Sequence, residues 1–347
     1  MTAASSLILG GPMGRRAAMH RHRAMVVGAL ILGCLVMAGF SVMTGSYNLH
    51  PGAILDVLRT QSDPIGRMVI VGMRLPRVVA SVCVGAGLGV AGKIFQSLGR
   101  NPLASPDLLG FTTGAATGAL VGILLLGQSS VGIAWGALLG GGAASAAVYL
   151  LTARHGLRGE RFILAGIAVS AMLAAFNEYL LTRADLERAE AAKTWLFGNL
   201  NGISWPQVDL LVPGMLGLLI CARLLWPWLR MLEMGDDLAT GLGLPTRRGR
   251  LALMGVGVGL SALATALAGP VHFLALAAAP LASSLLRSTD TGIAPAAAMG
   301  ALLLMISDFL AQHLLTPFQI PVGLVTGAIG GTYLIVLLTR RTKEAER

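Results

Sequence analysis

Apolar residues occur along the chain in long blocks, and short polar segments separate one block from the next. Most blocks are about 20 residues long, the length at which an α-helix spans the hydrocarbon core of a bilayer. The pattern therefore predicts an all-α, polytopic membrane protein with about ten transmembrane helices. The predicted runs are 24–44, 74–98, 107–127, 131–153, 161–182, 205–227, 248–268, 273–287, 296–315 and 322–339.

The stretch 74–118 has the pattern of a helical hairpin that is rich in glycine. Its first apolar run ends at a polar turn, residues 100–102, and a second apolar run follows. Gly110, Gly114 and Gly118 recur four residues apart in or near that second run. Small residues let helix backbones approach closely in a membrane bundle. We therefore predict tight helix packing at these glycines, near the transport pathway.

Charge is scarce, and it lies mainly between the apolar runs. Of the 347 residues, 12% are charged, against about 25% in an average soluble domain, which excludes a soluble enzyme of this length. With a cytoplasmic N-terminus, the cytoplasmic side holds 19 of the 26 Lys and Arg residues and the outer side holds 7. This asymmetry follows the positive-inside rule. Both termini are therefore predicted to be cytoplasmic, and the dispersed charge argues against a nucleic-acid surface.

This topology divides the chain into three parts. Residues 1–23 form a basic N-terminal tail, residues 24–339 a single transmembrane domain, and residues 340–347 a C-terminal tail. The first apolar run is longer than the core of a signal peptide, so it is interpreted as an uncleaved helix. Helices two to five and seven to ten run in opposite directions, which predicts an inverted repeat. Residues 183–204 begin charged and become apolar, which predicts a short surface helix.

Several motifs occur in a fixed order along these runs. RLPR begins at residue 74 and is followed by GAGLGVAG and by FQSLGRNPLASPDLLGFTTGAATG. The second half contains AGPVHFLALAAAP, ISDFLAQHLL and IPVGLVTGAIGGTYLIVLL. These motifs resemble the permease subunits of iron-siderophore and cobalamin ABC importers, called the FecCD family. The segment from FQSLGRNP onward is most similar to ferric-enterobactin-type permeases.

The resemblance implies a transport subunit, not an enzyme, that moves a ferric siderophore across the bacterial cytoplasmic membrane. It implies a second permease subunit, identical or paralogous, together with two cytoplasmic ATPases that use ATP and an external substrate-binding protein. Because the iron stays inside its chelate, no metal ligand or cofactor is expected on this chain. Cobalamin or haem is the alternative substrate.

Arg74 and Arg77 are candidates for docking of the binding protein. They stand at the predicted outer start of the second helix, where cations oppose the helix dipole, and they go against the positive-inside trend. In the family, such arginines meet carboxylates of the binding protein, which the resemblance implies here. The alternative is that both side chains reach lipid phosphates.

The polar turn after the second helix is a candidate gate. Pro102 restricts Asn101 to extended geometry, so the turn is expected to be rigid. We hypothesise that Asn101, Pro102 and Leu103 close the cytoplasmic end of the pathway. The alternative is an ordinary helix-breaking turn.

The cytoplasmic segment 230–250 is a candidate for contact with the ATPase. It has an acidic pair followed by regularly spaced leucines, which a solvated loop would not need. In the family, the matching segment inserts into a cleft of the ATPase subunit. The coupling residues that the resemblance implies are Asp236, Asp237, Leu238, Leu242 and Leu244.

The chain departs from the family pattern at three places. One extra alanine lies between Phe273 and Pro280, which leaves the register of the eighth helix open because one residue turns a helix by about 100°. His272 stands where a small residue is usual. Gln312 and His313 stand where many members have an arginine, so the two outer arginines are expected to contribute more to docking.

An ion-coupled secondary transporter and a membrane-embedded enzyme are the rival classes. Ionisable residues within a membrane span are functional candidates, but Lys93 lies near a cytoplasmic helix end, and Glu178 and Asp308 lie near outer ends where water is expected to reach them. No chain of acidic residues crosses the predicted bilayer centre. The sequence also has no HExxH, GxSxG or GxxxxGK[ST] motif. A permease that is energised by a separate ATPase needs none of these.

Overall fold

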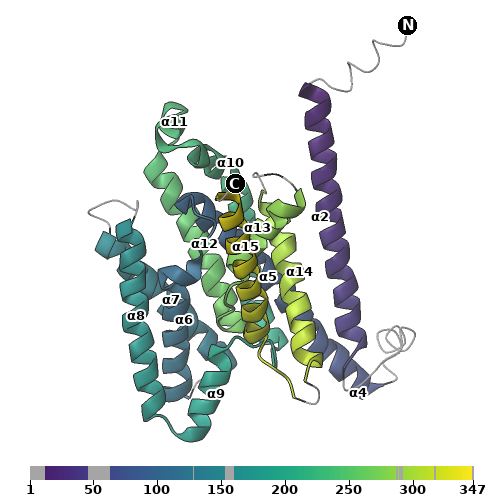
Figure 1. Ribbon diagram of the computed structural model, residues 1–347. Helices are drawn as coiled ribbons and strands as arrows, with labels where there is room; N and C mark the ends of the chain where they lie inside the picture. Colours follow the sequence, from purple (N-terminus) through teal and green to yellow (C-terminus); the bar gives the residue numbers. More distant parts are fainter. Residues whose placement is uncertain are drawn as a thin grey trace.

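The structure, a computed structural model, describes residues 12–45, 63–127, 129–152, 160–286, 288, 292–315 and 318–345. Every regular element in these ranges is a helix, so the all-α prediction is confirmed (Figure 1). Residues 1–11 and 346–347 of the predicted tails lie outside the described residues. The helices are α2 (Pro12–Met43), α4 (Pro64–Arg67), the π-helix η1 (Met68–Arg74), α5 (Leu75–Gly99), the 3₁₀ helix η2 (Pro106–Leu109), α6 (Phe111–Leu120), the π-helix η3 (Val121–Leu125), α7 (Ser130–Thr152), α8 (Glu160–Arg183), α9 (Leu186–Leu196), α10 (Trp205–Met234), α11 (Asp236–Gly241), α12 (Thr246–Ala268), α13 (Leu274–Leu286), α14 (Ile293–His313) and α15 (Val322–Ala345).

Each of the ten predicted apolar runs coincides with helix. Among the described residues, seven helical segments are long and apolar enough to cross a membrane. The other three runs are shorter apolar helices: Phe111–Leu125, α13, and Val322–Val336 of α15. The helical character of every run is confirmed, whereas the number of ten crossings stays a prediction. The predicted short surface helix coincides with α9, so its helical character is confirmed, whereas its place at the outer surface stays a prediction.

The second run begins earlier than predicted. Its helix starts at Pro64 instead of Arg74 and continues through the π-helical η1 into α5. Asp63 caps this start, since its side chain accepts a hydrogen bond from the Gly66 N–H at 3.0 Å, and proline suits a first helical turn. Arg74 and Arg77 therefore lie inside a helix. The argument that they oppose the dipole at a helix start is wrong.

The helix α5 lies at the centre of the bundle. It packs against α10, α12, α13 and α14, and most of its apolar span is buried. Glycines make the closest contacts, because a Cβ at Gly89 would overlap the backbone oxygen of Ala296 in α14. A Cβ at Gly92 would likewise overlap the backbone oxygen of Ala275 in α13. Such close approach of backbones drives helix association in a membrane, where lipid tails are as apolar as leucine.

The glycines of the predicted second run lie at two different contacts. A Cβ at Gly114 would be 2.7 Å from the backbone oxygen of Gly140 in α7, and a Cβ at Gly118 would overlap that of Gly136. Gly110 instead has a φ of 83°, and it lies between η2 and α6, against α8. Gly114 and Gly118 therefore form the contact between α6 and α7, whereas Gly110 redirects the chain.

The helix contacts of the two halves correspond to each other. The helix α5 of the first half packs on α14 of the second, and α12 of the second half packs on α7 of the first. In the same way α5 packs on α13, and α12 packs on α6. Since α5 to α8 correspond in order to α12 to α15, each contact has a counterpart with the halves exchanged. This exchange is the arrangement expected of an inverted repeat.

The two ends of the bundle carry different segments. Figure 1 shows α11 at one end, together with the start of α2 and the end of α15. It shows α4 and α9 at the opposite end. The segments predicted to be cytoplasmic therefore share one end, and the segments predicted to be outside share the other.

We expect Gly118→Ala to destabilise the bundle, because the added methyl group overlaps the backbone of α7. Overpacking of this kind typically costs about 1–3 kcal/mol. Gly142→Ala is the matched control, since a Cβ at this exposed position of α7 meets no atom within 4 Å. Thermal unfolding of both purified variants in detergent should show a lower midpoint for Gly118→Ala alone. Equal midpoints would contradict the packing role of Gly118.

Candidate functional site

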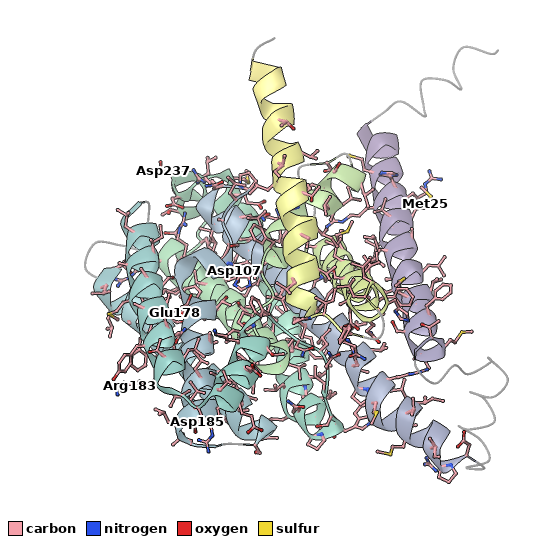
Figure 2. The ribbon with its side chains drawn as sticks, turned by 60° about the horizontal axis from the view of Figure 1, so that its bottom comes forward. Met25, Asp107, Glu178, Arg183, Asp185 and Asp237 are labelled. Atoms are coloured by element: carbon pink, nitrogen blue, oxygen red, sulfur yellow. The ribbon has the colours of Figure 1, made fainter. Side chains whose placement is uncertain are left out.

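Asp107 joins the two halves of the chain and is partly buried; Figure 2 labels it near the centre of the view. The hydroxyl of Thr112 donates a hydrogen bond to its Oδ1 at 2.7 Å. From the other half, the backbone N–H of Phe273 donates to the same carboxylate, and His272 lies close enough to interact with it electrostatically. Asp107 therefore lies at the positive N-terminal end of α13, where a carboxylate is favourable.

The two short helices in corresponding positions of the halves begin in a similar way. Phe273 precedes α13 with a φ of 63°, and Gly110 precedes α6 with a φ of 83°. The left-handed conformation is costly for a residue with a side chain, so the surroundings of Phe273 must hold it in place. Gly330 of α15 leaves room for the Phe273 side chain, because any Cβ there would overlap it. The extra alanine lies within α13, between this residue and Pro280.

The predicted gate turn directly follows the end of α5. Arg100 has a φ of 48°, and its N–H and that of Asn101 bond to carbonyls of the last helical turn. The Asn101 side chain accepts a hydrogen bond from the Leu103 N–H at 2.9 Å. The turn that also contains Pro102 is thus held by its own hydrogen bonds. Its role as a gate stays a prediction.

The predicted coupling residues do not form one surface. Leu238 and Leu242 are 58% and 61% exposed, and Asp237 is exposed beside them at the end of the bundle (Figure 2). Leu244 is only 6% exposed and belongs to the chain's own core, because the chain turns at Gly243, where φ is 84°. The assignment of Leu244 to a docking surface is therefore wrong.

Asp236 is also not a free charge at the rim of that surface. Its carboxylate pairs with the guanidinium of Arg250 at 2.7 Å. The same guanidinium donates a hydrogen bond to the backbone oxygen of Leu98, near the end of α5, at 3.3 Å. The acidic pair thus divides into Asp237, which faces outward, and Asp236, which faces the bundle.

Lys93 forms a second ion pair at this end of the bundle. Its Nζ lies 3.0 Å from Oε1 of Glu233, and the hydroxyl of Ser97 donates to the same oxygen at 2.5 Å. The ammonium also lies 5.9 Å from the ring centroid of Trp226, within range of a cation–π contact. With a side chain that is 9% exposed, Lys93 is buried against these partners.

Arg77 is paired within the chain at the opposite end. Its guanidinium contacts Asp308 in a bidentate manner, with Nη2–Oδ1 at 2.7 Å and Nε–Oδ2 at 3.0 Å. Gln312 donates to Oδ2 of the same carboxylate at 2.9 Å, and His313 stacks on Phe309. Asp308 is 3% exposed, so the expectation that water reaches it is wrong. Gln312, at one of the two positions where an arginine was expected, completes this ion pair.

The other two arginines of this region differ in exposure. Arg74 is partly buried and donates to the backbone oxygen of Val42 in α2 at 2.5 Å. Arg67 is exposed and lines an open groove along α4 and η1. The sequence interpretation missed Arg67 because it began the helix too late. The sequence Asp63-Pro64 is the start signal that would have included Arg67.

The described residues do not assemble a metal site. Among them, no three His, Cys, Asp or Glu side chains come together as ligands. The cysteines Cys34, Cys83 and Cys221 are not in disulfides. What the described residues offer is a central polar contact, a structured turn and exposed segments at the two ends.

Known proteins similar to this chain are transport proteins. The sequence profile described as the FecCD transport family matches residues 21–340. The chain is 45% identical over 322 residues to the ferric enterobactin transport system permease protein FepG of Escherichia coli (strain K12), covering 91% of this chain and 98% of that protein. It is 34% identical over 317 residues to the Fe(3+)-citrate import system permease protein YfmE of Bacillus subtilis (strain 168), covering 91% and 94%.

A solved structure shares the fold of this chain. It is described as an inward-facing conformation of a putative metal-chelate type ABC transporter. The superposition has a TM-score of 0.80 at 27% identity and covers 91% of this chain and 99% of that chain.

Removing one partner of the ion pair between Arg77 and Asp308 should be strongly destabilising. We expect Arg77→Ala to cost about 3–5 kcal/mol, because it leaves the Asp308 carboxylate buried without its partner. Arg67→Ala removes an exposed arginine from the same helix and should change stability by less than about 0.5 kcal/mol. Thermal unfolding in detergent compares the two. The exchange of Arg77→Asp with Asp308→Arg should recover part of the loss, and similar midpoints for both alanine variants would exclude an anchoring role.

Proposed function

The chain belongs to the FecCD transport family, and on that premise we propose that it is the permease subunit of an ABC importer that carries a ferric siderophore across the cytoplasmic membrane. The observation that carries the proposal is the similarity, over 91% of the chain, to the permease of a ferric enterobactin transport system. A bundle of membrane-spanning helices with an exposed apolar segment at one end fits such a subunit. The sequence has no phosphate-binding loop, so the energy must come from another subunit.

The alternatives receive less support. Cobalamin and haem are possible cargoes of this class of importer, but both relatives described above are named for the transport of iron complexes. An ion-coupled transporter would need titratable groups along its pathway. Instead, Arg77 pairs with Asp308, and Lys93 pairs with Glu233. Side chains held in ion pairs are better explained as packing contacts than as parts of a proton relay.

The proposed importer has several partners. A second permease subunit, identical or paralogous, completes the pathway, and two ATPases on the cytoplasmic side supply energy from ATP. An external binding protein delivers the ferric siderophore. In this assembly, both termini and α11 face the cytoplasm, whereas α4 and α9 face the outside.

The binding protein docks near the outer part of the second helix. Arg67 presents an exposed guanidinium there, and Arg74 lies further along the same helix. Either one can form a bidentate contact with a carboxylate of the binding protein. Since Asp308 already satisfies the charge of Arg77, Arg77 fixes the helix in position and contributes to docking only indirectly.

The gate lies at the cytoplasmic end of α5. Asn101, Pro102 and Leu103 close the inner end of the pathway in this proposal. The hydrogen bond from the Leu103 N–H to the Asn101 side chain supports it, because a gate must hold its shape when closed. The ion pair of Asp236 and Arg250 brings the coupling segment next to the helix that ends at this turn.

The exposed leucines Leu238 of α11 and Leu242, directly after α11, should dock on the ATPase. We expect Leu242→Asp to place an unpaired charge in that interface at a cost of several kcal/mol. The variant should reach the membrane, keep its thermal stability and lose copurification with the ATPase. Leu186→Asp, at an exposed leucine of α9 on the opposite end (Figure 1), should copurify normally. An intact and active complex of Leu242→Asp would move the coupling site elsewhere.

Reconstitution tests the substrate assignment. The chain, its ATPase and its binding protein are placed in proteoliposomes, and uptake of ferric siderophores, cobalamin and haem is compared. We expect uptake of a ferric siderophore that requires ATP on the ATPase side and the binding protein on the other side. Uptake of cobalamin or haem instead would change the assigned cargo. Uptake driven by an ion gradient without ATP would contradict the ABC importer itself.

A further inference from the structure

Arg250 lies where three helices meet. The helix α12 carries it, α11 begins next to it and α5 ends next to it. Its Nη2 contacts Oδ1 of Asp236 at 2.7 Å, and its Nη1 contacts the backbone oxygen of Leu98 at 3.3 Å. The side chain is largely buried. One guanidinium thus joins the segment assigned to the ATPase and the helix that leads to the gate turn.

The electrostatics of both contacts are favourable for a cation. The carboxylate of Asp236 lies in the first turn of α11, and the carbonyl of Leu98 belongs to the last turn of α5. The last carbonyls of a helix have no partner within the helix and form its negative end. A guanidinium holds its donors in a rigid planar fork, so Arg250 can serve both groups at once, whereas a lysine ammonium is a single point charge on a flexible stem.

The carbonyl of Leu98 is closely connected to the gate turn. The N–H groups of Arg100 and Asn101 bond back to carbonyls of the last turn of α5, so the chain between Leu98 and the turn is fully structured. The Arg100 side chain also donates to the backbone oxygen of Leu232 in α10 at 3.4 Å. The backbone at Leu98 and the turn at Asn101 are therefore connected by the hydrogen bonds of the last turn of α5.

A separate contact holds α5 to α10. Glu233 accepts hydrogen bonds from both Lys93 and Ser97 of α5, and it lies at the end of α10, before α11 begins. This contact does not involve α11. Arg250, in contrast, contacts α11 directly through Asp236.

We propose that Arg250 transmits the displacement of α11 by the ATPase to the end of α5 and thereby to the gate turn. The inference rests on the proposed function and assigns Arg250 as a positioning residue of the transport cycle. In this proposal, movement of Asp236 shifts the guanidinium through their ion pair, and the hydrogen bond from the guanidinium shifts the Leu98 carbonyl. Loss of Arg250 should therefore separate ATP hydrolysis from movement of the gate.

A cysteine reporter next to the turn measures this movement without a known substrate. Ala104, which is partly buried beside the turn, is changed to Cys in a chain whose Cys34, Cys83 and Cys221 are replaced by Ser. The complex with the ATPase is labelled with a maleimide in the nucleotide-free state and in the state trapped by vanadate. The labelling rate of the reference complex should differ between the two states.

Three variants distinguish a loss of transmission through Arg250 from a general loss of protein stability. Arg250→Gln removes both contacts of the guanidinium. The exchange of Asp236→Arg with Arg250→Asp restores an ion pair between α11 and α12, but a carboxylate cannot donate to the Leu98 carbonyl. Arg223→Gln removes an exposed arginine of α10 that lies outside segment 230–250, and it is the matched control.

We expect Arg250→Gln and the exchange to hydrolyse ATP but to label at the same rate in both states, whereas Arg223→Gln behaves like the reference. State-dependent labelling in Arg250→Gln or in the exchange would overturn the inference, as would a reference complex that labels equally in both states. If neither variant assembles with the ATPase, Arg250 serves docking instead, which also overturns it. A reference chain that binds no ATPase would refute the proposed function itself.

Discussion

Close approach of backbones around α5 is the constraint on which the rest of the structure depends. Apolar side chains gain nothing by leaving lipid for a neighbouring helix, so packing and polar contacts must hold the bundle together. Gly89 lets α5 lie directly on α14, and Gly92 lets it lie on α13. The same placement on α14 brings Arg77 to Asp308 at one end, whereas Lys93 pairs with Glu233 across the separate contact of α5 with α10. The ion pair of Arg77 and Asp308 therefore depends on the glycine contact with α14.

Sequence reasoning succeeded where the signal is local. Apolar runs of membrane length predict the helices, and a few residues around Pro102 are enough to predict the turn after α5. The missed helix start was also local, because Asp63 and Pro64 form a recognisable cap. The ion pair of Arg77 could not be predicted in this way. Its partner, Asp308, is 231 residues away, and nothing in either neighbourhood identifies the other.

Neighbouring residues of the coupling segment show a second limit of sequence reasoning. Asp237 is exposed while Asp236 pairs with Arg250. Leu242 is exposed while Leu244 is buried. The spacing of these residues is compatible with either outcome, since the direction of each side chain depends on how α11 turns into α12. A candidate surface could be identified from the sequence, but its individual members could not.

The central place of α5 has a consequence for biosynthesis. The helix emerges early from the ribosome, yet α12, α13 and α14, which surround it, are translated much later. Until then Arg77 has no Asp308 to pair with, and the glycine faces of α5 have no backbone to contact. A charge in the membrane without a partner is costly. It follows that the first half of the chain cannot reach its final arrangement alone, and that an intermediate must keep α5 in a provisional environment until translation is nearly complete.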